Sequence, residues 1–383
     1  MTSKPYEIVL QHDRYRQECL NLIASENVLS PAVRRALASD MASRYGFRPE
    51  FYSGTAKIHQ VWLLAEELGK QVFEAEHANV TPLSGHMALM MCLYVLCRRD
   101  GKIASVDPFY GGYPGLSNDK IPEIYGCRSV YIPYDSLQID AAHTVELLQR
   151  EKPEVVVLGA SLFLYPMPVR EVSEAVHSYG GYVVYDGSHV LGLIAGSMFQ
   201  KPLQDGADVL VGSTHKSFFG PQGGIILTND EKIAKKIEET AFHKFVDNIH
   251  FNRVAALAVA LDEMRRNGHR YAEKVVENSA ELARSLENNG LKPFKTKLGY
   301  TKSHQVYLPY QESEGIKVRD VLEKSRILVD IGVRVGTSEV TRRGMGVKQM
   351  SRIARLFRMA MDGENVAAEA RSLALRFKTV KFT

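Results

Sequence analysis

Two segments decide the fold: YVVYDGSH (182–189) and DVLVGSTHKSFFGPQGG (208–224). Each opens with a short run of β-branched and aliphatic residues, a pattern typical of a buried strand, and then becomes polar. Asp186 and His189 come at the end of the first run, and His215 and Lys216 follow the second. Because ligands bind outside the carboxyl ends of the strands in open α/β sheets, we expect these four side chains to converge on one cleft.

Similar runs recur along the chain and predict further strands: KIASVD (102–107), SVYIP (129–133), EVVVLGAS (154–161) and GGIILT (223–228). Helical patterns separate these runs. An alternation of strands and helices favours a mostly parallel sheet with helices on both faces. Residues 61–76 and 84–98 also have helical periodicity and would pack against that sheet. The predicted fold class is therefore α/β.

A long helical pattern at 253–287 marks the point where this organisation changes. A strand at 304–309, a helix near 318–325, a strand at 332–337 and C-terminal helices come after it, and together they predict a smaller α+β domain. We therefore expect three parts: an N-terminal arm (1–30), a large domain (31–252), and a long linking helix with a small C-terminal domain (253–383).

The composition argues against several classes of protein. The chain has 383 residues, 45% of them hydrophobic, and its net charge of +4 contains no block of like charges, which argues against a nucleic-acid partner. The charged N-terminus lacks the apolar core of a signal peptide, and the longest apolar run, 89–97, is too short to span a membrane. Four scattered cysteines favour reduced thiols. We expect a cytoplasmic protein with no membrane partner and no metal site.

Lys216 and Asp186 together indicate pyridoxal phosphate chemistry. A lysine amine condenses with the aldehyde of this cofactor to a Schiff base, and a carboxylate keeps the pyridine nitrogen protonated so that the ring accepts electrons from Cα. Ser84 and Gly85 precede a helical pattern and would bind the phosphate at a helix N-terminus. Each feature alone has a structural explanation, as a surface lysine, a turn former or a helix cap. Their combination favours a cofactor site.

The chain resembles the serine (glycine) hydroxymethyltransferases, fold-type-I pyridoxal-phosphate enzymes that are dimers of two-domain subunits. The resemblance rests on motifs that occur in the family's order: LIASEN (22–27), EHANVTPLSG (76–85), VVVLGAS (155–161), VVYDGSHVLGLIAG (183–196), THKSFFGPQGG (214–224) and GVRVGTSEVTRRGM (332–345). The THK-x-x-x-GP-x-GG segment is the most specific of them. The implied fold is a large domain with a mostly parallel sheet between helices, plus a smaller C-terminal α+β domain.

The resemblance implies a role in cofactor binding for each matching residue. Lys216 would form the Schiff base, Asp186 would pair with the pyridine nitrogen, and Ser84 with Gly85 would bind the phosphate. Further contacts to the cofactor would come from five residues: Tyr113, Ser161, His189, Thr214 and His215. The implied cofactor is pyridoxal 5'-phosphate.

The same resemblance implies substrate contacts and a shared site. Arg334 would bind the carboxylate of a small amino-acid substrate through its planar fork, assisted by Ser25. Tyr45 and Tyr52 match tyrosines that reach into the partner subunit's site, so a homodimer with a shared active site would be obligatory. Ordinary half-buried packing is an equally open explanation for these two tyrosines.

Two departures from the family pattern concern proton transfer and ring stacking. Gly46 and Phe47 stand where the family has a glutamate used in proton handling, and Glu50 is nearby but displaced. Tyr113 stands in place of the ring-stacking histidine. An aromatic ring can still stack on the cofactor there, but an imidazole is lost.

Other departures concern the phosphate and the one-carbon carrier. Phe219 replaces an arginine of the THK segment, and residues 241–252 replace a glycine-rich segment before the long helix. SRILVD passes directly into IGVRVGT, whereas the family inserts a loop that helps to hold folate. Other residues must therefore contact the phosphate in this chain. The missing loop argues against dependence on folate.

We expect an enzyme that makes or breaks the Cα–Cβ bond of a small β-hydroxy-amino acid, with glycine and an aldehyde as the other reaction partners. The candidate proton carriers are His189, Tyr45, Tyr52 and Glu50. An aminotransferase or racemase is the alternative, because it needs only the freed Lys216 as a proton shuttle. A non-catalytic homologue that binds the cofactor is a third possibility.

Overall fold

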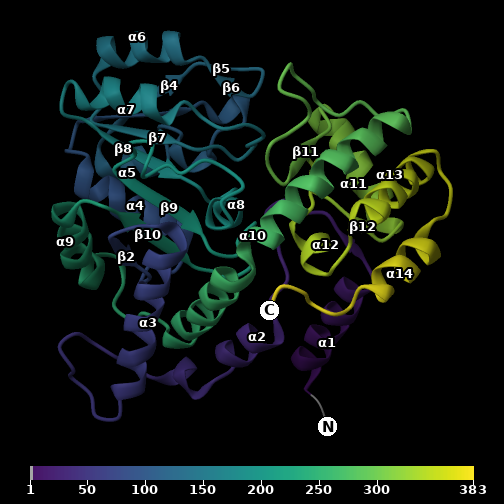
Figure 1. Ribbon diagram of the computed structural model, residues 1–383, viewed down its shortest axis with the longest axis horizontal. Helices are drawn as coiled ribbons and strands as arrows, with labels where there is room; N and C mark the ends of the chain where they lie inside the picture. Colours follow the sequence, from purple (N-terminus) through teal and green to yellow (C-terminus); the bar gives the residue numbers. More distant parts are fainter. Residues whose placement is uncertain (1–2) are drawn as a thin grey trace. The chain divides into compact units, whose positions relative to one another are not determined.

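A seven-stranded sheet forms the centre of the larger of two structural units (Figure 1). Its strands, in spatial order, are β2 (His77–Asn79), β10 (Gly224–Thr228), β9 (Val209–Ser213), β8 (Tyr182–Asp186), β7 (Val155–Leu158), β3 (Lys102–Val106) and β4 (Arg128–Ile132). Strands β9, β8, β7, β3 and β4 run parallel to one another, while β10 is antiparallel to both of its neighbours. The mostly parallel sheet predicted from the sequence is therefore confirmed.

Helices cover both faces of this sheet. Val209 and Val211 of β9 pack with α4 (Gly85–Leu96) in one hydrophobic cluster. Leu210, between them, lies instead beside Phe73 of α3 (Ala56–Phe73) and Ile194 of α8 (Leu191–Ala195). Since successive side chains of a strand point to opposite faces, α4 lies on one face and α3 with α8 on the other.

Further helices of the larger unit connect or flank the strands: α2 (Pro31–Leu37), α5 (Ile121–Tyr125), α6 (Ala141–Glu151), α7 (Val169–His177) and α9 (Glu231–Thr240). A short hairpin of β5 (Tyr134–Asp135) and β6 (Gln138–Ile139) follows β4. The small unit contains α1 (Lys4–Gln17), β1 (Leu20–Asn21), β11 (Gln305–Tyr307), α11 (Glu312–Lys324), β12 (Ile327–Leu328), β13 (Arg334–Gly336), α12 (Ser338–Arg342), α13 (Val347–Met361) and α14 (Ala367–Arg376).

The computed structural model describes residues 3–383, and its two units do not follow the chain in simple order. The larger unit is Leu29–Ala272, whereas the segment before it, up to Val28, belongs with Glu273–Phe382. Helix α10 (Phe251–Asn288) begins in the larger unit and ends in the smaller one. The division predicted from the sequence, with a separate arm at 1–30 and a boundary at 252/253, stays a prediction.

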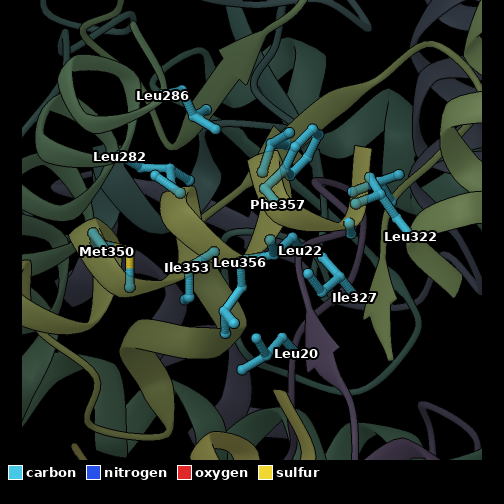
Figure 2. Packing of buried hydrophobic residues seen from close by; sticks show 14 of the residues in the cluster. Leu20, Leu22, Leu282, Leu286, Leu322, Ile327, Met350, Ile353, Leu356 and Phe357 are labelled. Atoms are coloured by element: carbon cyan, nitrogen blue, oxygen red, sulfur yellow. The ribbon is translucent and has the colours of Figure 1, made fainter. Parts of the chain in front are cut away.

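The smaller unit has its own hydrophobic core (Figure 2). Leu20 and Leu22 from the N-terminal segment are fully buried there and pack with residues from later in the chain, among them Ile327 and Phe357. Strand β1 pairs in parallel with β12, which fixes this segment against the C-terminal elements. Burying one such leucine contributes roughly 1.5–3 kcal/mol, so the segment around Leu20 and Leu22 is held in this unit by packing as well as by hydrogen bonds.

Within residues 3–383, every helix falls short of the length and apolarity that crossing a membrane requires. The same part of the chain contains no cluster of three or more histidine, cysteine or acidic side chains that could hold a metal ion.

Candidate active site

The carboxyl ends of β8 and β9 bring the two key segments together. Asp186 is the last residue of β8 and pairs with Val211 of β9, so the chain leaves both strands at the same edge of the sheet. His189 and Lys216 follow these ends, and Lys216 Nζ lies 3.4 Å from His189 Nε2. His189 is almost fully buried. The structure thus brings a lysine amine and an imidazole to the edge of the sheet where the sequence predicts a cleft.

Asp186 is held close to the backbone of the neighbouring strand. Its Oδ1 accepts a hydrogen bond of 3.0 Å from the backbone N–H of Ser188. A Cβ at Gly159, just after β7, would come within 2.6 Å of the Asp186 carbonyl oxygen, so only glycine allows the two strand ends to approach this closely. Burial and, in addition, the charge of Asp186 raise the pKa of Tyr113.

The segment around Lys216 is closed by its own backbone. Thr214 N donates to the Gly223 carbonyl at 3.1 Å, Gly220 N donates to the Thr214 carbonyl at 2.8 Å, and Thr214 Oγ1 donates to the Pro221 carbonyl at 2.6 Å. These bonds fix the turn from which Lys216 projects. Burial, and secondarily the positive charge of Lys216, lower the pKa of His215 to about 4, so that imidazole is neutral at neutral pH.

Ser84 and Gly85 begin helix α4 directly against the strand ends. Ser84 is the N-cap, and its Oγ accepts a 3.1 Å hydrogen bond from Met87 N. A Cβ at Gly85 would lie 2.2 Å from Ser213 Oγ and 3.1 Å from Ser188 Oγ. Hydroxyl groups and the positive end of a helix therefore meet here, which is the donor set that a phosphate requires. The residues present fit pyridoxal phosphate on this ground.

Tyr113 has a partner that the sequence-based prediction missed. Its hydroxyl lies 2.7 Å from Nδ1 of His86, in the first turn of α4, and the two rings meet edge to face at 6.1 Å. A Cβ at Gly115 would lie 2.4 Å from Cε1 of the Tyr113 ring, so the loop is shaped around that ring. The signal for His86 was present, because it directly follows the predicted Ser84-Gly85 pair.

Ser161 is joined to the loop that carries Tyr113. The backbone N–H groups of Ser161 and Leu162 both donate to the Gly111 carbonyl, at 2.8 and 3.0 Å. These bonds bring the segment after β7 to the loop after β3. The structure therefore brings Ser161 and Tyr113 to the same edge of the sheet as Asp186.

Tyr45 and Tyr52 lie in a separate aromatic segment. Their ring centroids are 5.6 Å apart, and the Tyr52 ring also contacts Phe47 and Phe51 of the same stretch. Tyr45 is 49% exposed and Tyr52 is 43% exposed, with Phe51 between them at 78%. In the single chain these tyrosines thus form part of an exposed aromatic surface.

Ser25 and Arg334 belong to the smaller unit. Gly336 N donates to the Leu22 carbonyl at 2.7 Å, and a Cβ at Gly336 would lie 2.5 Å from Ala24 Cα, so the turn containing Ser25 runs beside β13. Arg334 Nη2 lies 3.2 Å from Asp330 Oδ2, and its backbone N–H donates to Oδ1 of the same carboxylate. Arg334 is therefore held in place by an acidic neighbour.

The whole chain is similar to a solved structure and to curated relatives. The chain is similar to the L-threonine transaldolase from Pseudomonas fluorescens in its internal aldimine state, with a TM-score of 0.89 and 25% sequence identity over 97% of this chain and 90% of that one. The fold and the site define a fold-type-I pyridoxal-phosphate enzyme of the hydroxymethyltransferase and aldolase type.

The family model for serine hydroxymethyltransferase matches residues 3–357, and the chain belongs to that family. It is 40% identical to the serine hydroxymethyltransferase of Methanopyrus kandleri, over 98% of this chain and 93% of the relative. It is 37% identical to that of Archaeoglobus fulgidus, over 100% of this chain and 92% of the relative. The cofactor is therefore pyridoxal phosphate, as the resemblance implied.

Proposed function

We propose that this enzyme cleaves or forms the Cα–Cβ bond of a small β-hydroxy-amino acid, with glycine and an aldehyde as the other partners, and that Lys216 holds the cofactor. The observation that carries the proposal is the 3.4 Å contact between Lys216 Nζ and His189 Nε2, at the strand ends where Asp186 also lies. An amine that can bind the cofactor and an imidazole that can move a proton are thus available in one place.

Bound pyridoxal phosphate withdraws electrons from Cα of an attached amino acid. Asp186, whose Oδ1 is oriented by Ser188 N–H, would keep the pyridine nitrogen protonated. The other residues proposed to hold the cofactor are Ser84, Gly85, Tyr113, Ser161, His189, Thr214 and His215. Burial keeps His215 neutral beside Lys216, so this imidazole adds no positive charge at the proposed cofactor site.

Arg334 and Ser25 would bind the carboxylate of the substrate. Asp330 holds the Arg334 side chain from one side, which limits the rotamers that the guanidinium can adopt before substrate arrives. A guanidinium fixed in this way binds a carboxylate with a smaller loss of conformational entropy.

One observation supports transamination or racemisation as the second candidate. Glu50 is the acidic residue nearest in sequence to the family's missing glutamate, and its carboxylate is already engaged by His59 Nδ1 at 2.6 Å. A site without a carboxylate base for the substrate hydroxyl would leave Lys216 as the principal proton carrier. Aldol cleavage needs a base near the substrate hydroxyl. The two reactions therefore differ in whether His189 acts as that base.

We also propose that the active form is a homodimer. Tyr45, Phe51 and Tyr52 expose three aromatic rings on one short segment, and a second copy of the chain would bury them. These tyrosines would then reach the partner's site, as in the family. A cytoplasmic location stays a prediction.

The proposed function is tested with purified protein, pyridoxal phosphate, and threonine or β-phenylserine in the absence of folate. Release of an aldehyde supports the aldol reaction, whereas conversion of an added keto acid to an amino acid supports transamination. Lys216→Ala should abolish the visible absorbance of lysine-bound cofactor. Lys201→Ala, which removes a surface lysine paired with Glu74, should leave it intact. If serine is turned over only in the presence of a tetrahydropterin, the proposal that the reaction is independent of folate is wrong.

A further inference from the structure

Arg253 is a buried cation whose charge has no acidic partner among the described residues. It lies in the first turn of α10, within the larger unit, and is only 6% exposed. Its Nη2 donates to the carbonyl oxygens of Val80, Thr81 and Ile249 at 2.8, 3.2 and 3.2 Å. Its Nε and Nη1 are buried without a hydrogen-bond partner. Burial lowers its pKa to about 10, and no carboxylate opposes that effect.

The surroundings of Arg253 belong to the loops of the cofactor site. The Nη1 atom lies 2.9 Å from the point that a Cβ at Gly223 would occupy, and Thr214 Oγ1 lies 3.1 Å from the same point. The carbonyls of Val80 and Thr81, which accept from Arg253, belong to the segment that leads into Ser84. Arg253 thus lies between the turn after Lys216 and the segment that precedes α4.

The glycines of this turn make room for the guanidinium and for the start of α4. Gly224 N donates to the Pro82 carbonyl at 3.0 Å, and a Cβ at Gly224 would lie only 2.3 Å from the Ser84 carbonyl oxygen. A side chain at Gly223 would meet the guanidinium itself. The GPQGG sequence therefore packs the Lys216 turn against the start of α4, and the missing side chain at Gly223 makes room for the Arg253 guanidinium.

A buried guanidinium with two unpaired donors is costly unless an anion compensates it. The neighbouring position that carries an arginine in the family is Phe219 here, and this ring is fully buried against Tyr271, with centroids 4.9 Å apart. The THK turn thus supplies an apolar ring at that position. A phosphate monoester offers two negative charges and several acceptor oxygens, which suit the donor geometry of arginine.

We propose that Arg253 supplies a charged contact to the phosphate of pyridoxal phosphate bound at the Ser84–Gly85 helix start. This proposal rests on the proposed binding of the cofactor at Lys216. It assigns to α10 a part of the phosphate site that the family sequence places elsewhere. Because Arg253 would act on the phosphate alone, its effect should depend on whether the ligand carries one.

The test compares the affinities of pyridoxal phosphate and pyridoxal, which differ only in the phosphate. Binding to the full-length protein is followed by the absorbance of the lysine-bound cofactor in the wild type, Arg253→Met and Arg253→Lys. We expect Arg253→Met to weaken the binding of pyridoxal phosphate about 10- to 100-fold, the size typical of a charged hydrogen bond. The affinity for pyridoxal should not change. Arg253→Lys should recover part of the preference.

The matched control is Arg342→Met. Arg342 is also fully buried and donates to backbone carbonyls, those of Lys381 and Phe382, but it lies in the smaller unit. Its loss should lower stability without changing the ratio of the two affinities. A second readout uses inorganic phosphate, which should raise the Tm of the cofactor-free wild type but not that of Arg253→Met.

The outcomes separate this proposal from the proposed function. If the wild type binds pyridoxal phosphate and Arg253→Met lowers the affinities for both ligands equally, Arg253 only supports the loops and the inference fails. If Arg253→Met does not fold, the affinity ratio in Arg253→Lys and Arg253→Gln decides, and an unchanged ratio in both overturns it. If the wild type itself shows no lysine-bound cofactor, the assignment of Lys216 fails instead.

Discussion

His86 Nδ1 lies 2.7 Å from the hydroxyl oxygen of Tyr113, and this contact joins the first turn of α4 to the loop after β3. The two elements carry different parts of the proposed cofactor site: the phosphate contact at Ser84 and the ring-covering residue Tyr113. A movement of the Tyr113 loop is therefore coupled to the helix start. This relationship motivates the first prediction.

Tyr113→Phe should retain the aromatic cover and lose only the hydrogen bond to His86. Because His86 is exposed, the bond is worth about 0.5–1 kcal/mol, and the cofactor should dissociate two- to fivefold faster. His86→Ala should have a similar effect, and the double variant should be no worse than either single one. Dissociation is measured by the decay of cofactor absorbance after dilution into a trapping amine. Fully additive effects would show that the two side chains act separately.

The second prediction concerns acid stability. The pKa of His215 is about 4 in the folded protein and near 6.5 when the chain is unfolded. The unfolded state therefore binds more protons between these values, so the free energy of unfolding is unaffected above pH 6.5 and falls as the pH drops toward 4. Between pH 7 and pH 5 the loss from this group is about 2 kcal/mol.

His215→Gln removes this titration and should therefore flatten the pH dependence. Urea unfolding at pH 7 and pH 5 measures the difference in both proteins. The wild type should lose about 2 kcal/mol more than the variant over this interval. Equal losses would mean that His215 already takes up its proton in the folded protein near its ordinary pKa.

The third prediction tests the packing of the helix start on the strand ends. Gly85→Ala would place a Cβ 2.2 Å from Ser213 Oγ and 3.0 Å from Ser213 N, so the protein should lose roughly 1–3 kcal/mol of stability and bind cofactor more weakly. Adding Ser213→Ala removes the closer contact and should restore part of the loss. Gly332→Ala is the control, because its nearest neighbour is 3.5 Å away. Thermal unfolding and cofactor titration report the two effects.

The fourth prediction concerns two cysteine thiols that lie side by side. Cys97 Sγ and Cys127 Sγ are 3.2 Å apart, and both thiols are free. Burial and the neighbouring Cys127 raise the pKa of Cys97, so little thiolate forms at neutral pH and oxidation should be slow. With hydrogen peroxide we expect a disulfide between the two, faster at higher pH, seen as a loss of two hydrogens by peptide mass spectrometry. Cys97→Ser should prevent it, and a Cys19–Cys92 link in its place would contradict the geometry.

Local patterns predicted the strands of the central sheet well, because buried parallel strands are continuous β-branched runs. The runs at 182–186 and 208–213 coincide with β8 and β9 to within a residue, and the predicted helix at 253–287 lies within α10. Strand β2 is missing from the prediction, since His77–Asn79 contains no β-branched residue. Its extended form depends on antiparallel pairing with β10, far along the chain.

The sequence by itself determined the α/β class, the family, and the strand ends at which Asp186 and Lys216 lie, because each of these depends on patterns that are local in the chain. The tertiary structure alone decided that His86 meets Tyr113, and that Arg253 is buried beside Gly223 with no acidic partner within residues 3–383. These properties arise only when segments distant in sequence pack together. In the sequence, Arg253 is an ordinary residue of a helical pattern. Because the fold buries its charge, an anion is needed to compensate it.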